Sequence, residues 1–293
     1  MNRRSFLRSA SATSLFIASA EPILAELAAD NAYRKNIGIQ LYTLRDALGN
    51  DPGGTLKEVA AAGYKQVELY GFPDCEPLIT GAKDAGLSVN SAHFNWDSVV
   101  NPSDEKMGDF SKIVEKGREI GLSHLVIPYL HDHQRGSLDA YKQIAENANK
   151  AAEIAQTAGI QLAYHNHAFE FEPKDGGKCG YDILMDEFSD KMKFELDIFW
   201  IKVGGHDPAD FVTKLSGRVS QLHLKDLKDG LKLPDYGSIP EDAFKELGNG
   251  IIKLGPVIAA AEKAGVKHCH VEQDYSPDAM ASIKESAAYL AKM

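Results

Sequence analysis

The sequence predicts a single-domain α/β protein of the (β/α)8 barrel class, and three observations support this. Short apolar stretches alternate eight times with longer amphipathic stretches, a pattern typical of a parallel sheet covered by helices. A glycine repeatedly joins helix to strand, as in "AAGYKQVEL" and "TAGIQLAYH", because glycine readily adopts the left-handed conformation that ends a helix. The length of 293 residues suits one such domain. A doubly wound open sheet is the alternative, but no Gly-x-Gly-x-x-Gly motif follows the first strand.

The predicted strands are short apolar runs, and the predicted helices follow them in turn. The strands cover residues 36–42, 64–69, 87–93, 124–128, the first part of 159–171, 194–197, 219–225 and 266–272. The helices cover residues 55–62, 74–85, 103–120, 138–158, 181–188, 208–215, 254–264 and 277–291. Asp51 and Pro52 suit the N-cap and first residue of the first helix. Residues 227–250, rich in Asp, Gly and Pro, are predicted to form a loop that helps to close the site.

Residues 1–29 are predicted to be an export signal, and the barrel is expected to cover residues 30–293. Arg3 and Arg4 precede a Phe-Leu pair and an Ala/Ser-rich stretch too short to span a bilayer. This grouping resembles the twin-arginine signal, so we expect a periplasmic protein with no stable membrane insertion after signal removal. A disordered basic tail on a cytosolic protein is the alternative.

Composition excludes some classes of function. The formal net charge of −10 argues against a nucleic-acid partner, since binding to phosphate backbones needs a basic surface. The same charge disfavours an apurinic endonuclease on this fold. The three cysteines, Cys75, Cys179 and Cys269, have no CxxC spacing and form neither a disulfide framework nor a zinc knuckle. A small-molecule enzyme or a cation-binding protein fits better.

The last four predicted strands each end in side chains that bind metals or transfer protons. The candidate ligands are His165, Asp197, His223 and Glu272. The C-terminal ends of barrel strands form one active face, so these groups are expected to converge. So many ionisable groups are costly together unless a cation compensates them. We therefore predict one divalent metal ion, with Mn, Co, Zn and Mg as candidates and the histidines favouring a transition metal.

Some assignments on these strands stay open. His165 and His167 face the same way by strand alternation, and Glu170 could reach in from the following loop. Asp197 could instead cap a helix, and Glu195 is a competing ligand deeper in the barrel. The predicted catalytic residues are Glu272, Glu170 and His165. The predicted substrate contacts are Glu68, His93, His167, Lys225 and Trp200.

Four motifs, "AYHNHAFEF", "ELDIFW", "HLKD" and "HVEQD", occur in this order. With them, the chain resembles the xylose isomerase-like TIM-barrel superfamily, also called sugar phosphate isomerases/epimerases. The resemblance implies one divalent cation held by Glu, Asp, His and Glu from strands five to eight, and proton transfer through an enediolate. By position, Asp197, His223 and Glu272 match three of these ligands.

The fifth strand departs from the family pattern. The ketose epimerases carry a glutamate where this chain has His165, and their two glutamates act as acid and base on opposite faces of the sugar. Glu272 therefore lacks its symmetric partner unless Glu170 substitutes. Relatives with a Tyr-His-Asn-His strand look more like the dehydratases or keto-sugar lyases of the superfamily.

The prediction for function is a metal-dependent sugar isomerase or epimerase. It would abstract a proton next to a carbonyl through a metal-stabilised enediolate. A dehydratase or 3-keto-glycoside lyase or hydrolase with the same metal and base is the alternative, and a non-catalytic exported sugar-binding protein is the second. The expected partner is a small carbohydrate, and an oligomer is possible.

Overall fold

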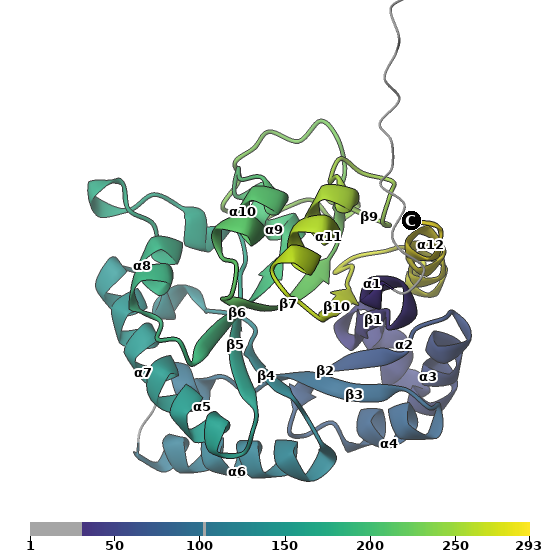
Figure 1. Cartoon of the computed structure of the whole chain (residues 1–293), viewed down its shortest axis with the longest axis horizontal. Coiled ribbons are helices and arrows are strands. Elements are labelled where there is room, and N and C mark those ends of the chain that lie inside the picture. Colours follow the sequence, from purple (N-terminus) through teal and green to yellow (C-terminus); the bar gives the residue numbers. More distant parts are fainter. Residues whose placement is uncertain (1–30, 102–103) are drawn as a thin grey trace, which may run out of the picture.

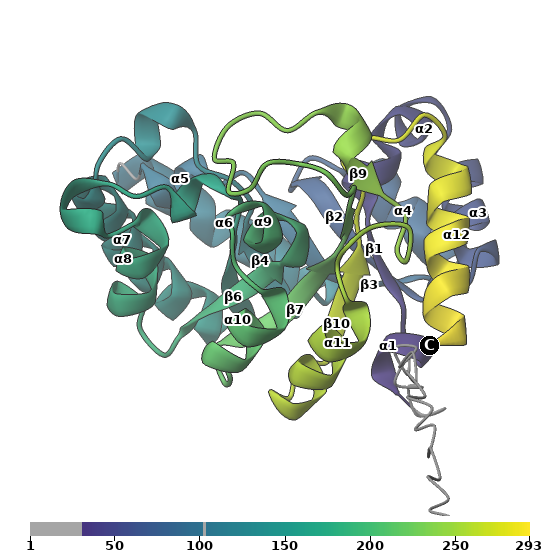
Figure 2. The ribbon, with the colours of Figure 1, turned by 90° about the horizontal axis from the view of Figure 1, so that it is seen from above.

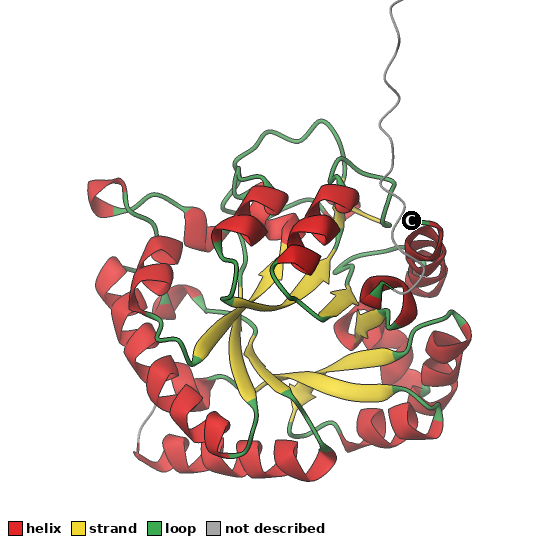
Figure 3. Cartoon of the chain, viewed as in Figure 1, coloured by secondary structure: helices red, strands yellow, loops and turns green. Residues whose placement is uncertain are grey.

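The computed structural model describes residues 31–101 and 104–293. Eight parallel strands close into a barrel in the order β1-β10-β7-β6-β5-β4-β3-β2, and helices surround it (Figures 1 and 3). The predicted single-domain (β/α)8 fold is confirmed. The predicted export signal at residues 1–29 lies outside the described residues, so export and periplasmic location stay predictions. Among the described residues, no helix has the length and apolar character needed to cross a bilayer.

The elements match the predicted ones within a few residues. The barrel strands are β1 (Gly38–Gln40), β2 (Gln66–Phe72), β3 (Ser88–Phe94), β4 (His124–Ile127), β5 (Gln161–His165), β6 (Met192–Asp197), β7 (Val219–Leu224) and β10 (His268–Val271). The main helices are α3 (Pro52–Ala61), α4 (Glu76–Asp84), α6 (Asp104–Ile120), α7 (Leu138–Thr157), α8 (Gly180–Glu187), α10 (Pro208–Lys214), α11 (Leu254–Lys263) and α12 (Ala279–Lys292).

Several short elements are not predicted, because they are too short to show a helical or strand period. They are α1 (Ala32–Lys35), α2 (Arg45–Asn50), α5 (Asp97–Val100), α9 (Ile198–Val203) and the antiparallel pair β8 (Asp226–Leu227) and β9 (Phe244–Lys245). The first strand is also shorter than predicted, since a 3-10 helix begins at Leu41. Residues 227–250 are therefore not only loop: β8 and β9 anchor the arch between them, which Figure 2 shows beyond the strands.

The glycines between helices and strands have the conformation that the sequence predicts. Gly159 has a φ of 74°, and the four other glycines in these joins, Gly63, Gly86, Gly121 and Gly265, also have positive φ values. A residue with a Cβ atom is strained in this region. These positions therefore turn each helix back into a strand at the end of the barrel away from the site.

The inside of the barrel is polar, whereas the layer between barrel and helices is apolar. Gln221 on β7 donates hydrogen bonds across the barrel to Glu68 on β2 and Ser91 on β3. Its neighbour Leu222 faces the other way and belongs to the buried apolar core. Side chains that point inward at the strand ends therefore meet in one place.

Candidate metal centre

The four predicted ligands form one cluster at the C-terminal ends of the strands. His165 and Asp197 are the last residues of β5 and β6, His223 lies near the end of β7, and Glu272 follows β10. One donor atom from each lies within 4.8 Å of the others, and all four side chains are buried. The structure thus brings together the whole predicted set.

The two carboxylate oxygens of Asp197 have different partners: one caps a helix and the other faces the cluster. Oδ1 accepts from the backbone N–H groups of Phe199 (2.9 Å) and Trp200 (3.1 Å) and caps α9. Oδ2 lies 3.2 Å from Nε2 of His165. Asn166 bonds both the N–H and the C=O of Asp197 and so joins β5 to the end of β6. Both interpretations of Asp197, helix cap and cluster member, therefore hold, one oxygen for each.

His223 has its ring orientation fixed by a buried carboxylate. Nε2 lies 2.6 Å from Oε1 of Glu68, which can only accept a hydrogen bond when ionised, so Nε2 carries the hydrogen. Nδ1 faces the cluster, 2.9 Å from Oε2 of Glu272 and 3.1 Å from Nε2 of His165. Burial alone would lower the pKa of His223, but the surrounding carboxylates raise it. A carboxylate behind a histidine is the usual way in which proteins orient a metal-binding imidazole.

A second group of possible ligands, Glu68, Glu195, His223 and His270, lies deeper in the barrel. Its carboxylates accept hydrogen bonds from neutral and imidazole donors: Gln40, Ser91 and His223 to Glu68, Gln221 to both, and His93 to Glu195. Burial alone would lower the pKa of His93, but the two carboxylates raise it to about 9. This deeper group works as a hydrogen-bonded support for His223, and none of its four members lines the cavity described below.

Lys225 balances the negative charge of the cluster. Its Nζ lies 3.0 Å from Asp197, 2.7 Å from Glu272 and 2.9 Å from Asp274, and the side chain is fully buried. Burial opposes charge on all these groups, but the ion pairs outweigh it: they raise the pKa of Lys225 and lower the pKa of Asp197 and Glu272. All three groups are therefore charged at neutral pH.

A divalent cation fits the chemistry of the cluster. Two imidazole nitrogens and two carboxylate oxygens face one another, and the hydrogen bond from Nε2 of His223 to Glu68 turns Nδ1 toward the cluster, where a bound ion would take the place of a proton. This mixture of N and O donors suits Mn, Co or Zn, and Mg less well. His165, Asp197, His223 and Glu272 are the residues that would hold the ion.

A cavity of about 1080 Å³ opens above the cluster. Of the predicted site residues, six line it: His93, His165, His167, Trp200, Lys225 and Glu272. Asp197 and His223 lie below it. Glu68 is fully buried and does not line it, so the structure gives Glu68 a supporting position behind His223 in place of the predicted substrate contact.

Glu170 does not join the cluster. The 3-10 turn Phe169–Phe171 carries it to the outer face of β5, where Oε1 accepts from the Tyr164 hydroxyl (2.7 Å) and Oε2 from the N–H of His167 (2.9 Å). It is fully buried and does not line the cavity. Burial raises its pKa to about 7, although these hydrogen bonds partly oppose the rise. Its position favours a structural role over the predicted catalytic one.

Replacing Glu170 by glutamine is expected to change how stability depends on pH. Between its usual pKa near 4.5 and about 7, the unfolded chain releases this proton while the folded chain keeps it. The free energy of unfolding therefore falls by up to about 3 kcal/mol as pH rises through this window. Glu170→Gln removes that loss, so the variant gains stability relative to the wild type across the window in urea unfolding.

Glu172→Gln, at an exposed carboxylate two residues away, is the matched control and should not show the gain. A constant stability difference between Glu170→Gln and the wild type at all pH values would contradict a buried, protonated Glu170.

Several residues that line the cavity are absent from the sequence prediction. They are Tyr129 and Arg135 after β4, Phe169 after β5, and Tyr275 after β10. Each follows the C-terminal end of a strand, the same signal that identified the cluster. Their position after a strand could be predicted from the sequence. Loop residues, however, show no alternation that indicates which side chains point into the cavity.

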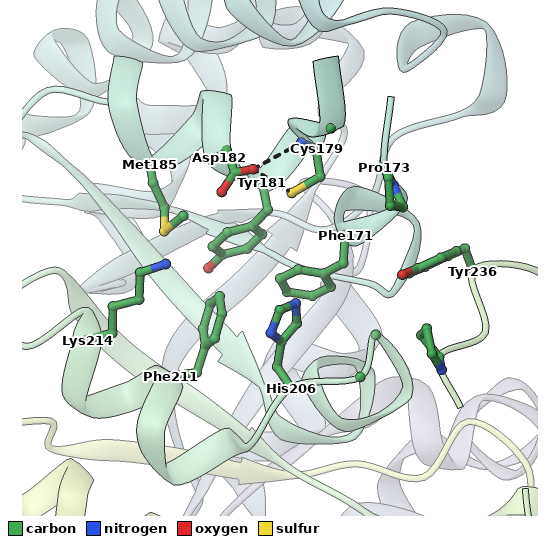
Figure 4. A pocket seen from close by; sticks show the side chains of 14 residues that line it. Phe171, Pro173, Cys179, Tyr181, Asp182, Met185, His206, Phe211, Lys214 and Tyr236 are labelled. Atoms are coloured by element: carbon green, nitrogen blue, oxygen red, sulfur yellow. Dashed lines mark hydrogen bonds between the residues drawn. The ribbon is translucent and has the colours of Figure 1, made fainter. Parts of the chain in front are cut away.

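A second cavity, of about 370 Å³, lies outside the barrel between α8, α10 and the arch (Figure 4). Phe171, Tyr181, Phe211 and His206 form much of its wall, and Cys179 bonds to Asp182 at its edge. No residue of the metal cluster lines it. Cys75, Cys179 and Cys269 are all free thiols, as predicted.

Comparisons with known proteins agree with this architecture. The chain is 23% identical over 226 residues to inosose dehydratase of Clostridium beijerinckii. The aligned region covers 69% of this chain and 74% of the relative. It is 25% identical to a crystal structure of a sugar phosphate isomerase/epimerase from Parabacteroides distasonis, with a TM-score of 0.74 and coverage of 88% of this chain and 98% of that one.

A third match shares the fold at lower identity. It is a xylose isomerase-like TIM barrel protein from Mycobacterium smegmatis in complex with magnesium, 16% identical, with a TM-score of 0.65 and coverage of 89% of this chain and 97% of that one. The family model described as xylose isomerase-like TIM barrel matches residues 56–293. The chain therefore belongs to the xylose isomerase-like TIM barrel family.

Proposed function

We propose that the protein is a metal-dependent carbohydrate dehydratase or lyase. It would remove a proton next to a carbonyl group and expel an oxygen substituent from the neighbouring carbon. One observation carries the proposal: of the four cluster residues, only His165 and Glu272 line the cavity. From the cluster, a substrate therefore meets one carboxylate and one imidazole, which suit a base and a proton donor for elimination.

When bound by the four cluster residues, a divalent cation would polarise the substrate carbonyl and acidify the adjacent C–H bond. The donor set favours Mn, Co or Zn. Support for a metal also comes from the magnesium complex of the Mycobacterium smegmatis protein, although it supports only the class of cofactor.

Glu272 and His165 would each move one proton. The carboxylate of Glu272, held by Lys225 at 2.7 Å, accepts the proton from carbon, and the electron pair of that C–H bond forms a carbon–carbon double bond. The C–O bond at the next carbon breaks, and the leaving oxygen takes a proton from Nδ1 of His165. This nitrogen is buried and has no hydrogen-bond partner in the described part of the chain. It carries the hydrogen because Nε2 faces the cluster.

Support for elimination comes from the inosose dehydratase similarity. Isomerisation or epimerisation, the first prediction from the sequence, is the second candidate. It is favoured by the similarity to the Parabacteroides distasonis isomerase/epimerase and by the position of His165, which could donate a proton to the carbon that Glu272 deprotonates. Both reactions begin with removal of a proton from carbon. They differ in whether a proton is then added back to that carbon or an oxygen substituent leaves the neighbouring carbon.

The test is exchange of a substrate's carbon-bound hydrogen with solvent deuterium. With Mn or Co added, the wild-type protein is expected to exchange this hydrogen in a keto-sugar or 3-keto-glycoside, and a chelator should stop it. Nuclear magnetic resonance then separates an unsaturated product from an epimer. Binding of these sugars without any metal-dependent exchange would overturn the proposal in favour of a sugar-binding protein.

A further inference from the structure

Five residues on the β3–β5 side of the cavity form a continuous surface, here called the aromatic wall. They are Trp96, Tyr129, Arg135, His167 and Phe169. The Tyr129 ring contacts the rings of Trp96, His167 and Phe169 at centroid distances of 6.4, 4.9 and 5.4 Å. The guanidinium carbon of Arg135 lies 3.5 Å from the centre of the Phe169 ring. The wall stands beside the metal centre, and His167 joins the two through its 5.0 Å contact with His165.

The wall contains polar atoms that lack partners. Nε1 of Trp96, Nε of Arg135 and Nδ1 of His167 are buried and form no hydrogen bond within the described residues. Leaving a buried polar group unpaired costs about 1–3 kcal/mol. Such atoms in residues that line a cavity indicate that a bound molecule supplies the partners, and indole and guanidinium N–H groups require an acceptor such as a hydroxyl oxygen.

The charges in the cavity disfavour a phosphorylated ligand. Among its lysine and arginine side chains, the cavity lining contains Arg135 and Lys225. Arg135 already pairs with Asp132, and Lys225 pairs with three carboxylates. His93, whose pKa is raised to about 9, also lines the cavity but pairs with Glu68 and Glu195. A phosphate group would therefore find carboxylates and no uncommitted cation among these three residues. A neutral, hydroxylated ligand avoids this repulsion.

The cavity is larger than the volume that one sugar ring occupies. At about 1080 Å³ it lies at the upper end of the roughly 300–1,000 Å³ that encloses drug-sized ligands. One sugar ring at the cluster would fill only part of this volume and leave room beside the aromatic wall.

We propose that the aromatic wall is a second subsite, which binds a neutral hydroxylated ring attached to the sugar at the metal centre. The substrate class is then a two-ring glycoside, with the ring at the wall as its leaving group. A ring face packs against Tyr129, and hydroxyl oxygens accept from Trp96 and Arg135. The Phe169 ring is stacked against Arg135 and His167 and holds them in place. This assignment rests on the proposed function for its chemistry, but binding at the wall needs neither metal nor turnover.

The chain offers a selective reporter for this subsite. It has two tryptophans, Trp96 and Trp200, and both line the cavity. Trp200→Phe leaves Trp96 as the single tryptophan, so its fluorescence reports on the wall. Cellobiose, glucose and glucose 6-phosphate are titrated into this variant without added metal. None of these sugars carries the ketone that turnover requires, so the titrations measure binding alone. Calorimetry on the wild-type protein repeats the comparison without a substitution.

We expect cellobiose to change Trp96 emission and to bind about tenfold more tightly than glucose, with glucose 6-phosphate no tighter than glucose. Arg135→Ala should weaken cellobiose about tenfold and change glucose by less than about twofold. Arg118→Ala, at an exposed arginine of α6, is the matched control and should change neither.

Equal affinity for cellobiose and glucose, or unchanged cellobiose binding in Arg135→Ala, would overturn the subsite. Tighter binding of glucose 6-phosphate would replace it with an anion site. Because these titrations measure binding alone, the subsite can fail while metal-dependent hydrogen exchange persists, and exchange can fail while the subsite holds.

Discussion

Replacing Asp197 by alanine is expected to abolish metal binding and turnover together. Oδ2 faces His165 and Lys225 in the cluster, and no neighbouring carboxylate can take its place without moving a strand. The variant also loses the cap of α9, which costs about 0.5–2 kcal/mol of stability. Metal content of the purified protein and the rate of solvent hydrogen exchange are the measurements. The same result is expected for His223→Ala.

Two further variants separate the ligand from the cap. Asp197→Asn keeps a side-chain oxygen for the helix but places an amide nitrogen in the cluster, so it should fold well and still lose the metal. Asp207→Ala removes the N-cap of α10, which accepts from the N–H groups of Ala209 and Asp210 outside the cavity. It should lose stability only. Wild-type metal content and turnover in Asp197→Ala would remove the metal assignment.

Glu272→Gln is expected to slow hydrogen exchange by about 10²–10⁴-fold while retaining more metal than Asp197→Ala. Glu272 is the one carboxylate of the four-residue cluster that lines the cavity, so it is placed to accept a proton from the substrate. Glutamine keeps an oxygen for the ion but cannot act as a base. The exchange rate and the metal content of the same preparation check both parts.

Glu246→Gln, at a carboxylate outside the cavity that accepts from Ser282, is the control and should exchange normally. Near wild-type exchange in Glu272→Gln would exclude this residue as the base.

The fold and the membership of the cluster could be predicted because they depend on regular patterns. Glycines end the helix in five of the connections from helix to strand, and strand ends in a barrel share one face. His165, Asp197, His223 and Glu272 could therefore be grouped without knowing any distance. Alternation along β6 also placed Glu195 and Asp197 on one face of the strand.

Depth in the barrel and loop conformation could not be predicted in this way. Glu68 points inward as expected, but the register of β2 with β1 and β3 places it opposite Gln40 and Ser91, below the cavity. Glu170 follows β5 closely, yet a single 3-10 turn carries it to Tyr164. Both outcomes depend on strand stagger and tertiary contacts, which leave no periodic trace in the sequence.

The buried ammonium group of Lys225 acts as an internal counter-ion for Asp197, Glu272 and Asp274. The polypeptide thereby offsets part of the repulsion among its own carboxylates. The barrel is therefore expected to assemble without a metal ion, and a chelating agent should inactivate the protein without unfolding it. If the proposed ion binds after folding, its identity would depend on the metal supply where the folded chain first meets it.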